Sequence, residues 1–479
     1  MLFAGKFEDF TKAFQNGDYA EAIQLIKPFA LQGDADAQYN MGRIYGVTFN
    51  GFELDYKEAA KWLNLAAEQG HVPAQFSLGL MYDLGQGVKQ DYAEAVKWYK
   101  LAAEQGNPVA QSFLGNMYNE GRGVTQDYAE AVKWYRLAAA QGFATEQLGT
   151  MYANGTGLVQ DYAEAVKWYK VAAEKGTAEA QYRLGVMYDE GRGVEKNTAE
   201  AVKRWLLAAE QGHVKAQSLL GLVYTVGSVV GKNDAEAFKW FKLAAEQGDF
   251  ISQFELARMY DVGKGIEQDS AEADKWHKLG NIQLAKEQFE NGAKFVLKND
   301  YVGAIKLFKL AAEKNNANAQ FNLGVMYEKG QGVTQDIVEA VKWFKLAAAQ
   351  GNANAQFNLG VMYKLGEGVT QDHAETTRLW ILAAEQGDAQ AQSNLGIMYD
   401  SGQGVTQDIV EAVKWYKLAA AQGNSKAQYN LGVAYKKGQG VTQDIVEAVK
   451  WYTLAAAQGN ANAQTALSNM YDDGLGVVH

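Results

Sequence analysis

Apolar and small residues recur along most of the chain in one pattern with a period near 36 residues. The centre of the pattern is a small residue, usually a glycine that follows leucine and is followed by a Met-Tyr pair one position further on. A fixed period of this length is typical of a solenoid, in which each repeat packs on its neighbours. The central residues are Gly42, Gly79, Gly115, Gly149, Gly185, Gly221, Ala257, Gly324, Gly360, Gly396, Gly432 and Ser468.

Two helices are expected in each repeat. The stretch 353–366 is an example of the first, here called helix A, in which small residues and Leu-Gly permit a close approach to neighbouring helices. In the second, helix B, Asp336 is a good N-cap, and Glu339 three residues later completes a pair typical of a capping box. Gly351 stands where such a helix ends with a positive φ. The GxGV segments between A and B are predicted to be turns rather than phosphate loops, since no strand precedes them and no GKS or GKT follows.

All 11 tryptophans fall in helix B, at two adjacent positions that follow the period. Because the repeat places them, we interpret them as core residues between repeats rather than as platforms for a ligand. The first position holds Trp62, Trp98, Trp134, Trp168, Trp240, Trp276, Trp343, Trp415 and Trp451, and the second holds Trp205 and Trp380.

The period breaks once, after Trp276. Residues 7–42 align without a gap on residues 289–324, and both segments carry a short Gly-Asp-Tyr or Asn-Asp-Tyr turn in place of GxGV. We therefore predict two arrays, 1–280 and 281–479, each of which opens with a cap-like helix pair. The absence of a Pro/Ser-rich linker favours a rigid kink over a free tether at the junction.

The final segment, 474–479, stops where the next helix B is expected. We predict that the second array ends without a closing helix. Either the chain is truncated there, or the open end is covered by another subunit or by a different protein.

The chain has a formal charge of −11 and no basic run, so nucleic acid is not an expected partner. No segment approaches the roughly 18 consecutive apolar residues of a membrane span, and membrane insertion is not expected. There is no cysteine for disulfides or thiolate chemistry, and the five histidines lie too far apart to suggest a metal site. Because MLFAGKFEDF is not a complete signal peptide, the chain is expected in the cytoplasm. The alternative is a periplasmic or secreted protein whose N-terminal signal is missing from this sequence.

Carboxylates are plentiful, but most recur with the period, as helix caps such as Asp91, Asp127 and Asp161 or as solvated helix charges. No Ser–His–Asp set, nucleophile elbow or nucleotide-binding fingerprint can be drawn from the sequence. We therefore predict a protein that is not an enzyme, with no catalytic residues, no cofactor and no metal.

The repeated unit A-x-A-Q-x-x-L-G-x-M-Y-x-x-G-x-G-V-x-x-D-x-x-E-A-x-K-W-Y-x-x-A-A-E-Q-G strongly resembles the SEL-one-like repeat (SLR), a relative of the tetratricopeptide repeat. The resemblance covers nearly the whole chain. It implies an all-α fold, a right-handed α-solenoid superhelix of helix-turn-helix repeats of about 36 residues. It also implies an adaptor or scaffold role, often in bacteria and in signalling, envelope or host-contact pathways. The cysteine-rich branch of the family, with a disulfide in each repeat, is excluded because this chain has no cysteine.

If helix A lines the concave face, as the resemblance implies, a partner would contact the helix A positions that packing does not fix. Two such positions vary within the chain: the second residue before the core leucine and the residue after the core glycine. Together they would form a ladder of aromatic and aliphatic groups that suits a peptide or protein segment. The same side chains could instead simply pack against the neighbouring helix A. The candidate partner-binding residues are Tyr39, Arg43, Phe76, Leu80, Asn116, Tyr182, Val186, Phe254, Arg258, Phe321, Val325, Phe357, Val361, Tyr429 and Val433.

Three functions remain open from the residues. The first is a protein-interaction scaffold, the second a binder of glycans or small ligands that uses aromatic stacking, and the third a structural protein that self-assembles through its C-terminal end. Asp83, Asp189 and Asp261 further suggest an acidic inner rim on the first array, which would prefer a basic or neutral segment.

Overall fold

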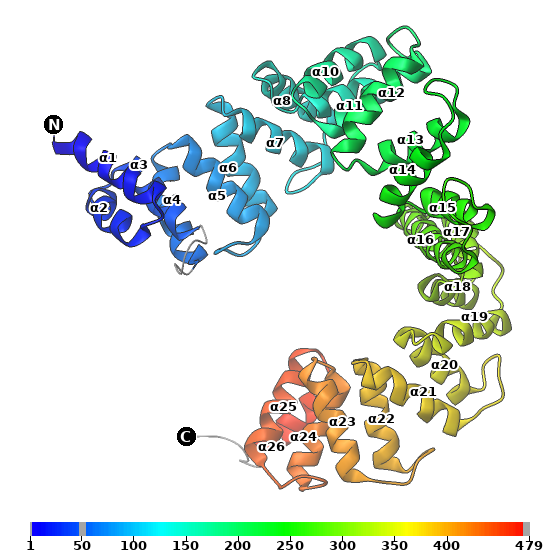
Figure 1. Ribbon diagram of the computed structural model, residues 1–479. Helices are drawn as coiled ribbons and strands as arrows, with labels where there is room; N and C mark the ends of the chain where they lie inside the picture. The colour runs from blue at the N-terminus through cyan, green and yellow to red at the C-terminus, as the bar shows by residue number, and fades with distance from the viewer. Residues whose placement is uncertain (1, 47–53, 473–479) are drawn as a thin grey trace. The chain divides into compact units, whose positions relative to one another are not determined.

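The computed structural model describes residues 2–46 and 54–472, which form α-helices joined by turns (Figure 1). No strand occurs in these two ranges. The predicted all-α solenoid of helix pairs is confirmed.

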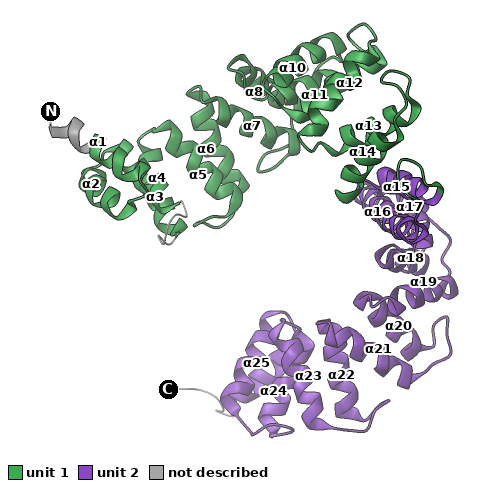
Figure 2. Ribbon diagram, in the orientation of Figure 1, with its two compact units in different colours: residues 1–247, 262–268 green, residues 248–261, 269–479 purple. Residues whose placement is uncertain are grey.

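The chain divides into two compact units (Figure 2), residues 1–247 with 262–268 and residues 248–261 with 269–479. Unit 1 contains α1 (Leu2–Gln15), α2 (Tyr19–Leu31), α3 (Ala35–Tyr45), α4 (Tyr56–Glu68), α5 (Val72–Leu84), α6 (Tyr92–Glu104), α7 (Pro108–Glu120), α8 (Tyr128–Ala140), α9 (Thr145–Asn154), α10 (Tyr162–Glu174), α11 (Ala178–Glu190), α12 (Thr198–Glu210), α13 (Val214–Val226) and α14 (Asp234–Glu246). Unit 2 contains α15 (Phe250–Val262, whose last residue belongs to unit 1), α16 (Ser270–Leu297), α17 (Tyr301–Glu313), α18 (Ala317–Lys329), α19 (Ile337–Ala349), α20 (Ala353–Leu365), α21 (His373–Glu385), α22 (Ala389–Ser401), α23 (Ile409–Ala421), α24 (Ser425–Lys437), α25 (Ile445–Ala457) and α26 (Ala461–Asp472).

The predicted helix ends are confirmed. The Asp336 side chain caps α19 and accepts a hydrogen bond from the backbone N–H of Glu339 at 2.9 Å. Asp91, Asp127 and Asp161 cap α6, α8 and α10 in the same way. The glycine that follows each of these helices supplies the positive φ that the turn requires, as Gly351 does with a φ of 88°.

The core glycine of helix A lies against an aromatic ring of helix B in the same repeat. A Cβ added to Gly79 would lie 2.7 Å from the ring of Tyr99, which is closer than van der Waals contact allows. Gly360 faces the indole of Trp380 in the same way. Glycine is therefore needed at this position because the two helices of a repeat pack at very short range.

A buried glutamine of helix A connects the ends of two B helices. The side-chain amide of Gln356 in α20 donates to the carbonyl of Ala348 at the end of α19, at 3.2 Å. Its Oε1 accepts from Nε2 of Gln386, the C-cap residue of α21, at 2.8 Å. The bond to Ala348 satisfies one of the carbonyls that a helix end leaves unpaired. Glutamines one period apart make the corresponding bonds in most repeats.

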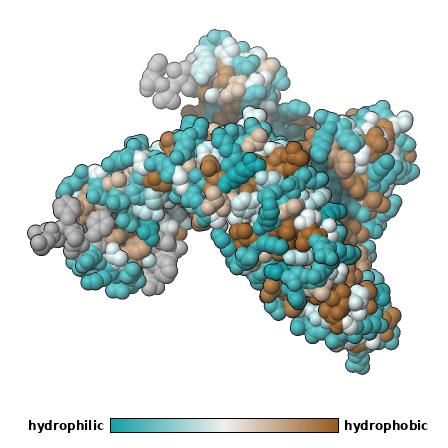
Figure 3. Space-filling view, turned by 90° about the horizontal axis from the view of Figure 1, so that it is seen from above, coloured by the Kyte–Doolittle hydropathy of each residue, from teal (hydrophilic) through white to brown (hydrophobic). Residues whose placement is uncertain are grey.

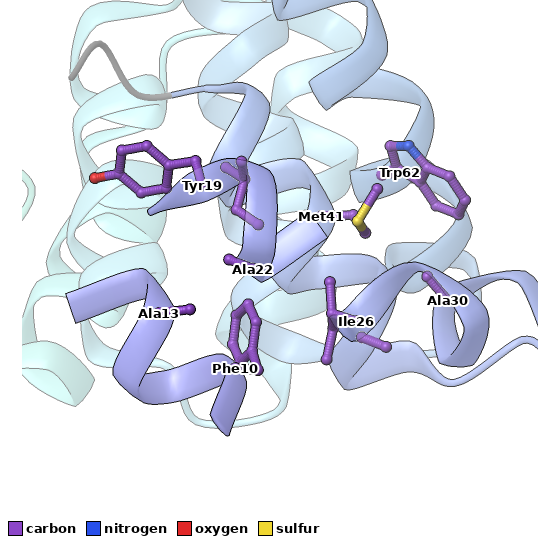
Figure 4. Close-up of a cluster of buried hydrophobic side chains, with 10 residues drawn as sticks. Phe10, Ala13, Tyr19, Ala22, Ile26, Ala30, Met41 and Trp62 are labelled. Carbon is purple, nitrogen blue, oxygen red and sulfur yellow. The ribbon is translucent and has the colours of Figure 1, made fainter. Parts of the chain in front are cut away.

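The tryptophans of helix B lie between repeats, as we interpreted from the sequence. Trp134 of α8 belongs to a buried cluster that joins α6 of the preceding repeat to α7. In the first such cluster, the ring of Trp62 lies beside Met41 (Figure 4). Trp415 occupies the same position in unit 2, in a cluster that contains Trp380. Their role in packing one repeat on the next is confirmed.

The predicted array boundary at residues 280 and 281 lies within α16, a 28-residue helix. The two cap-like starts are alike in structure, because Asp18 caps α2 and Asp300 caps α17 with nearly the same backbone angles. The final segment 474–479, on which the prediction of a missing closing helix rests, lies outside the described residues.

Candidate partner-binding face

The predicted partner-binding residues all lie on A helices, and the two predicted positions of a repeat are four residues apart. Residues four apart in a helix share one face. The side chains of Arg43 and Arg258 are exposed and the others are half-buried. The residues lie on α3 (Tyr39, Arg43), α5 (Phe76, Leu80), α7 (Asn116), α11 (Tyr182, Val186), α15 (Phe254, Arg258), α18 (Phe321, Val325), α20 (Phe357, Val361) and α24 (Tyr429, Val433).

The aromatic members of this set pack against helix B of their own repeat. The ring centre of Phe76 lies 5.7 Å from that of Tyr99, and the ring of Phe357 stacks on Trp380 at 6.0 Å. Tyr429 lies 5.8 Å from Tyr452. Each of these rings therefore contributes one side to the core, while part of its surface remains accessible. Alanine substitution at these positions would disturb folding as well as binding.

Two tyrosines of the set also stack on histidines. The ring centre of Tyr182 lies 4.6 Å from that of His213, and Nε2 of His213 is 2.8 Å from Oε2 of Glu179. Nδ1 of His213 accepts the backbone N–H of Ala216, so the neutral ring carries its proton on Nε2 and donates it to the carboxylate. Sequence reasoning missed this pair. Its signal is a histidine at the N-cap position of helix A, where other repeats have asparagine or aspartate.

A second pair of the same kind lies in the first repeat. Tyr39 and His71 have ring centres 4.6 Å apart, and Nε2 of His71 is 3.0 Å from Oδ1 of Asp36. Both pairs join the A helices of neighbouring repeats. They hold the predicted tyrosines in fixed orientations on this face.

A pocket of about 390 Å³ lies between α3 and α5 and includes two of the predicted residues, Arg43 and Leu80. Its wall also contains Phe14 and Tyr56. The guanidinium carbon of Arg43 lies 4.9 Å from the centre of the Phe14 ring, within the range of a cation–π contact. The pocket therefore combines an apolar lining with an exposed cation.

A second pocket, of about 220 Å³, lies beside α9, α10 and α11 and includes the predicted Tyr182 and Val186. It is lined in addition by Tyr162, Tyr169 and Arg183. Sequence reasoning missed these three residues. For Arg183 the signal is its position directly before the core leucine, which also differs from repeat to repeat.

Acidic groups beside this second pocket form a network around Arg183. Nε of Arg183 lies 2.6 Å from Oε1 of Glu179 and 3.7 Å from Oε1 of Glu146. Burial raises the pKa of Glu146 above its usual value, although Arg183 favours the carboxylate. Burial also opposes ionisation of Glu179, but the hydrogen bonds from His213 and Arg183 and the charge of Arg183 outweigh it and lower the pKa of Glu179.

The predicted acidic rim is not present at Asp83. This side chain is buried, where it accepts a hydrogen bond from the hydroxyl of Tyr99 at 3.2 Å and lies 3.3 Å from Nη1 of Arg122. Burial and the charge of Asp83 raise the pKa of Tyr99. Asp83 is thus a structural group that joins two repeats, and the rim prediction now rests on Asp189 and Asp261 alone.

Within residues 2–46 and 54–472, no group of three or more His, Asp or Glu side chains is arranged to hold a metal ion. A search of the same residues found no helix with the length and apolar character of a membrane span.

The family model for the Sel1 repeat matches thirteen consecutive segments of the chain. They are residues 35–71, 72–107, 108–143, 144–177, 178–213, 214–249, 251–280, 279–316, 317–352, 353–388, 389–424, 425–460 and 461–478. A search of curated proteins found no match.

Among solved structures, a protective antigen of uropathogenic Escherichia coli that displays an SLR fold is 35% identical, with a TM-score of 0.50. The match covers 95% of this chain and 91% of that one. A Sel1 repeat protein from Oxalobacter formigenes is also 35% identical, with a TM-score of 0.44 over 47% of this chain and 91% of that one. Sel1 repeats form scaffolds that typically mediate protein interactions and are generally non-catalytic. Because the repeat model matches nearly the whole chain and the Escherichia coli antigen is 35% identical over 95% of it, the chain belongs to the Sel1 repeat family.

Proposed function

We propose that the protein is a non-enzymatic scaffold that binds a segment of another protein along its A helices. The observation that carries this proposal is that two pockets on the A helices of unit 1 are lined by residues of the predicted set, Arg43 with Leu80 and Tyr182 with Val186. Their volumes, about 390 and 220 Å³, suit individual side chains of a bound segment rather than a large cofactor.

The chemistry of the two pockets supports a polypeptide ligand. The pocket at Arg43 offers an apolar surface beside a cation, which suits an aliphatic or aromatic side chain next to a carboxylate. The pocket at Tyr182 offers tyrosine rings beside Arg183 and Glu190. Different repeats therefore present different side-chain preferences, and a segment that spans several repeats would meet them in order.

Glycan binding is a second candidate function. It is favoured by Tyr162, Tyr182 and the two arginines of this pocket, Arg183 and Arg192, because sugars stack on aromatic rings and hydrogen-bond to charged groups. A glycan would need this one pocket, whereas a polypeptide would use several repeats.

The test is a selection of peptides from a random library displayed on phage, using the full chain as bait. We expect the selected peptides to bind the Arg43→Gln/Leu80→Ala double variant about tenfold more weakly, because the variant removes the contacts of one pocket. The matched control is Arg136→Gln/Leu137→Ala, which makes the same two changes at exposed positions on α8. Fluorescence anisotropy with the selected peptides measures both.

Equal affinity of the wild type, the Arg43→Gln/Leu80→Ala variant and a Val325→Ala/Val361→Ala variant would contradict the proposal. Binding of sugars on a glycan array that Val186→Ala alone abolishes, with no peptides selected, would establish the second candidate function instead.

A further inference from the structure

The B helices of unit 2 expose valines at a position where unit 1 has none. This position is the second residue after the helix N-cap, and in unit 2 it holds Val302, Val338, Val410 and Val446, each between 56% and 67% exposed. The other two residues of the series in unit 2 are Ala271 and Ala374. The corresponding residues of unit 1 are Ala20, Lys57, Ala93, Ala129, Ala163, Ala199 and Ala235. Valine is a weaker helix former than alanine, and exposed valines add nothing to the core, so folding does not explain their presence.

Two of these valines, Val410 and Val338, each lie on a helix face that also carries lysines and a leucine. Val410, Lys414, Lys417 and Leu418 follow one another at helical spacing and together line a hollow of about 420 Å³. Leu418 is 44% exposed. The same residue types recur on α19, two B helices earlier, at Val338, Lys342, Lys345 and Leu346.

The surface between two consecutive B helices of unit 2 is also hollowed. A pocket of about 440 Å³ is lined by Lys345 of α19, by Arg378 and Leu382 of α21, and by Tyr363 of α20. Figure 3 shows hydrophobic residues scattered among hydrophilic ones over the whole face in view, so the depressions are located by their lining residues. Aliphatic side chains and cations thus line the same two depressions of the surface.

Carboxylates also lie on this face, since Glu375 lines the pocket beside Lys345 and pairs with Arg378 at 2.7 Å. Two of the lysines are left without such a partner. The ammonium groups of Lys345 and Lys417 lie over the rings of Tyr363 and Tyr435, 5.5 and 5.7 Å from the ring centres. Among the described residues, no carboxylate lies within ion-pair distance of either ammonium group. Lys414 does pair with Glu411, at 3.0 Å, but both groups are exposed and such a pair contributes little.

From this geometry we propose that the B helices of unit 2 form a second docking surface, distinct from the A helices, for a polypeptide segment that carries aliphatic side chains and carboxylates. The aliphatic side chains enter the hollows beside Val410 and Leu418, and the carboxylates meet Lys345 and Lys417. Contact between the aliphatic side chains and the valines removes apolar surface from water, and each lysine forms a hydrogen bond with a carboxylate. Both contacts therefore favour binding of the same segment.

The test uses Val338→Ala/Val410→Ala/Val446→Ala, which gives three B helices of unit 2 the residue that unit 1 already has. Alanine is the better helix former, so this variant is expected to fold with unchanged or slightly higher stability. Peptides from a random phage-displayed library are selected on the full wild-type chain and measured against this variant and against Lys345→Gln/Lys417→Gln. We expect a class of peptides, rich in aliphatic residues and in Asp and Glu, whose affinity falls about tenfold in each variant.

This class should keep its affinity for the Arg43→Gln/Leu80→Ala variant, which separates the second surface from the A-helix site. The proposal would be overturned if every selected peptide bound the triple valine variant as tightly as the wild type. It would also be overturned if the peptides that lose affinity lacked acidic residues. Sedimentation of the wild type provides a further readout. Concentration-dependent association that the valine variant abolishes would identify a second copy of the chain as the occupant and would also overturn it.

Discussion

Gly324 shows how a single residue sets the distance between the two helices of a repeat. A Cβ at this position would lie 2.5 Å from the ring of Phe344. One repeat in the described chain has alanine here, Ala257, and in that repeat the aromatic position of helix B holds the smaller His277. The size of one residue is thus matched to the size of the other.

Replacement of Gly324 by alanine should therefore destabilise the fold by overpacking. We expect a loss of about 1–3 kcal/mol in the free energy of unfolding, measured by urea denaturation, with unchanged helix content in the folded state. Val410→Ala, at an exposed position of α23, is the control and should change stability by less than about 0.5 kcal/mol. A Gly324→Ala protein as stable as the wild type would show that the two helices separate at little cost.

The sequence predicted that Leu-Gly permits close helix packing, but not which ring the glycine meets. Helix B carries two adjacent aromatic residues, such as Trp343 and Phe344, and both are compatible with a helical period. Only the register between the helices decides that Phe344 faces Gly324 while Trp343 packs on the cluster of the preceding repeat. For the same reason the sequence could not tell that Phe357 and Tyr429 pack on their own B helices.

At the scale of the helices, buried glutamines hold the end of one B helix to the next. The caps at helix N-termini were predictable because Asp and Glu have local partners three residues away. The glutamine bonds were not, although Ala-x-Ala-Gln is part of the repeated unit, because their partners lie 8 and 30 residues away. Local signals identify helix ends, whereas long-range bonds require the packing.

Replacement of Gln356 by alanine should lower the free energy of unfolding by about 1–3 kcal/mol. The loss arises because the carbonyl of Ala348 loses its buried side-chain donor and the amide of Gln386 loses one of its acceptors. Asn354→Ala, two residues earlier on the same helix and exposed, is the matched control. Thermal and urea unfolding measure both. Similar stabilities of the two variants would mean that the glutamine bonds contribute nothing net to folding.

On the scale of the whole chain, each repeat contacts its neighbours through the same set of bonds. The period predicted this organisation, and the helix bounds follow it closely. The boundary between two arrays at residues 280 and 281 stays a prediction, because α16 runs across it without a break. No glycine or proline signal ends the helix there, since Gly280 is accommodated within it beside Phe254.

Deletion of one complete repeat, residues 389–424, should leave a folded protein. The junction joins Asp388 to Ser425 and places Gln428 where Gln392 was, so that it meets the same carbonyl, that of Ala384. We expect the helix content per residue to be unchanged by circular dichroism and total stability to fall by roughly 2–5 kcal/mol, the average for a segment of this length.

The control for this deletion removes only residues 389–408, which brings two B helices into direct succession. We expect that protein to aggregate or to lose far more stability, because α23 then lacks α22, the helix A of its own repeat. Equal behaviour of the two deletions would contradict a repeat-by-repeat architecture.

The equivalence of the joints between repeats has a consequence for how such a gene changes. The same thirteen-residue stretch occurs at 331–343, 403–415 and 439–451, so a repeat inserted or lost at one of these places leaves the same residues at the junction. Each such change adds or removes one complete repeat, together with its glutamine hydrogen bonds and the contact between its core glycine and a ring. This protein can therefore be lengthened or shortened in whole repeats, and each step changes the number of A helices that the chain presents.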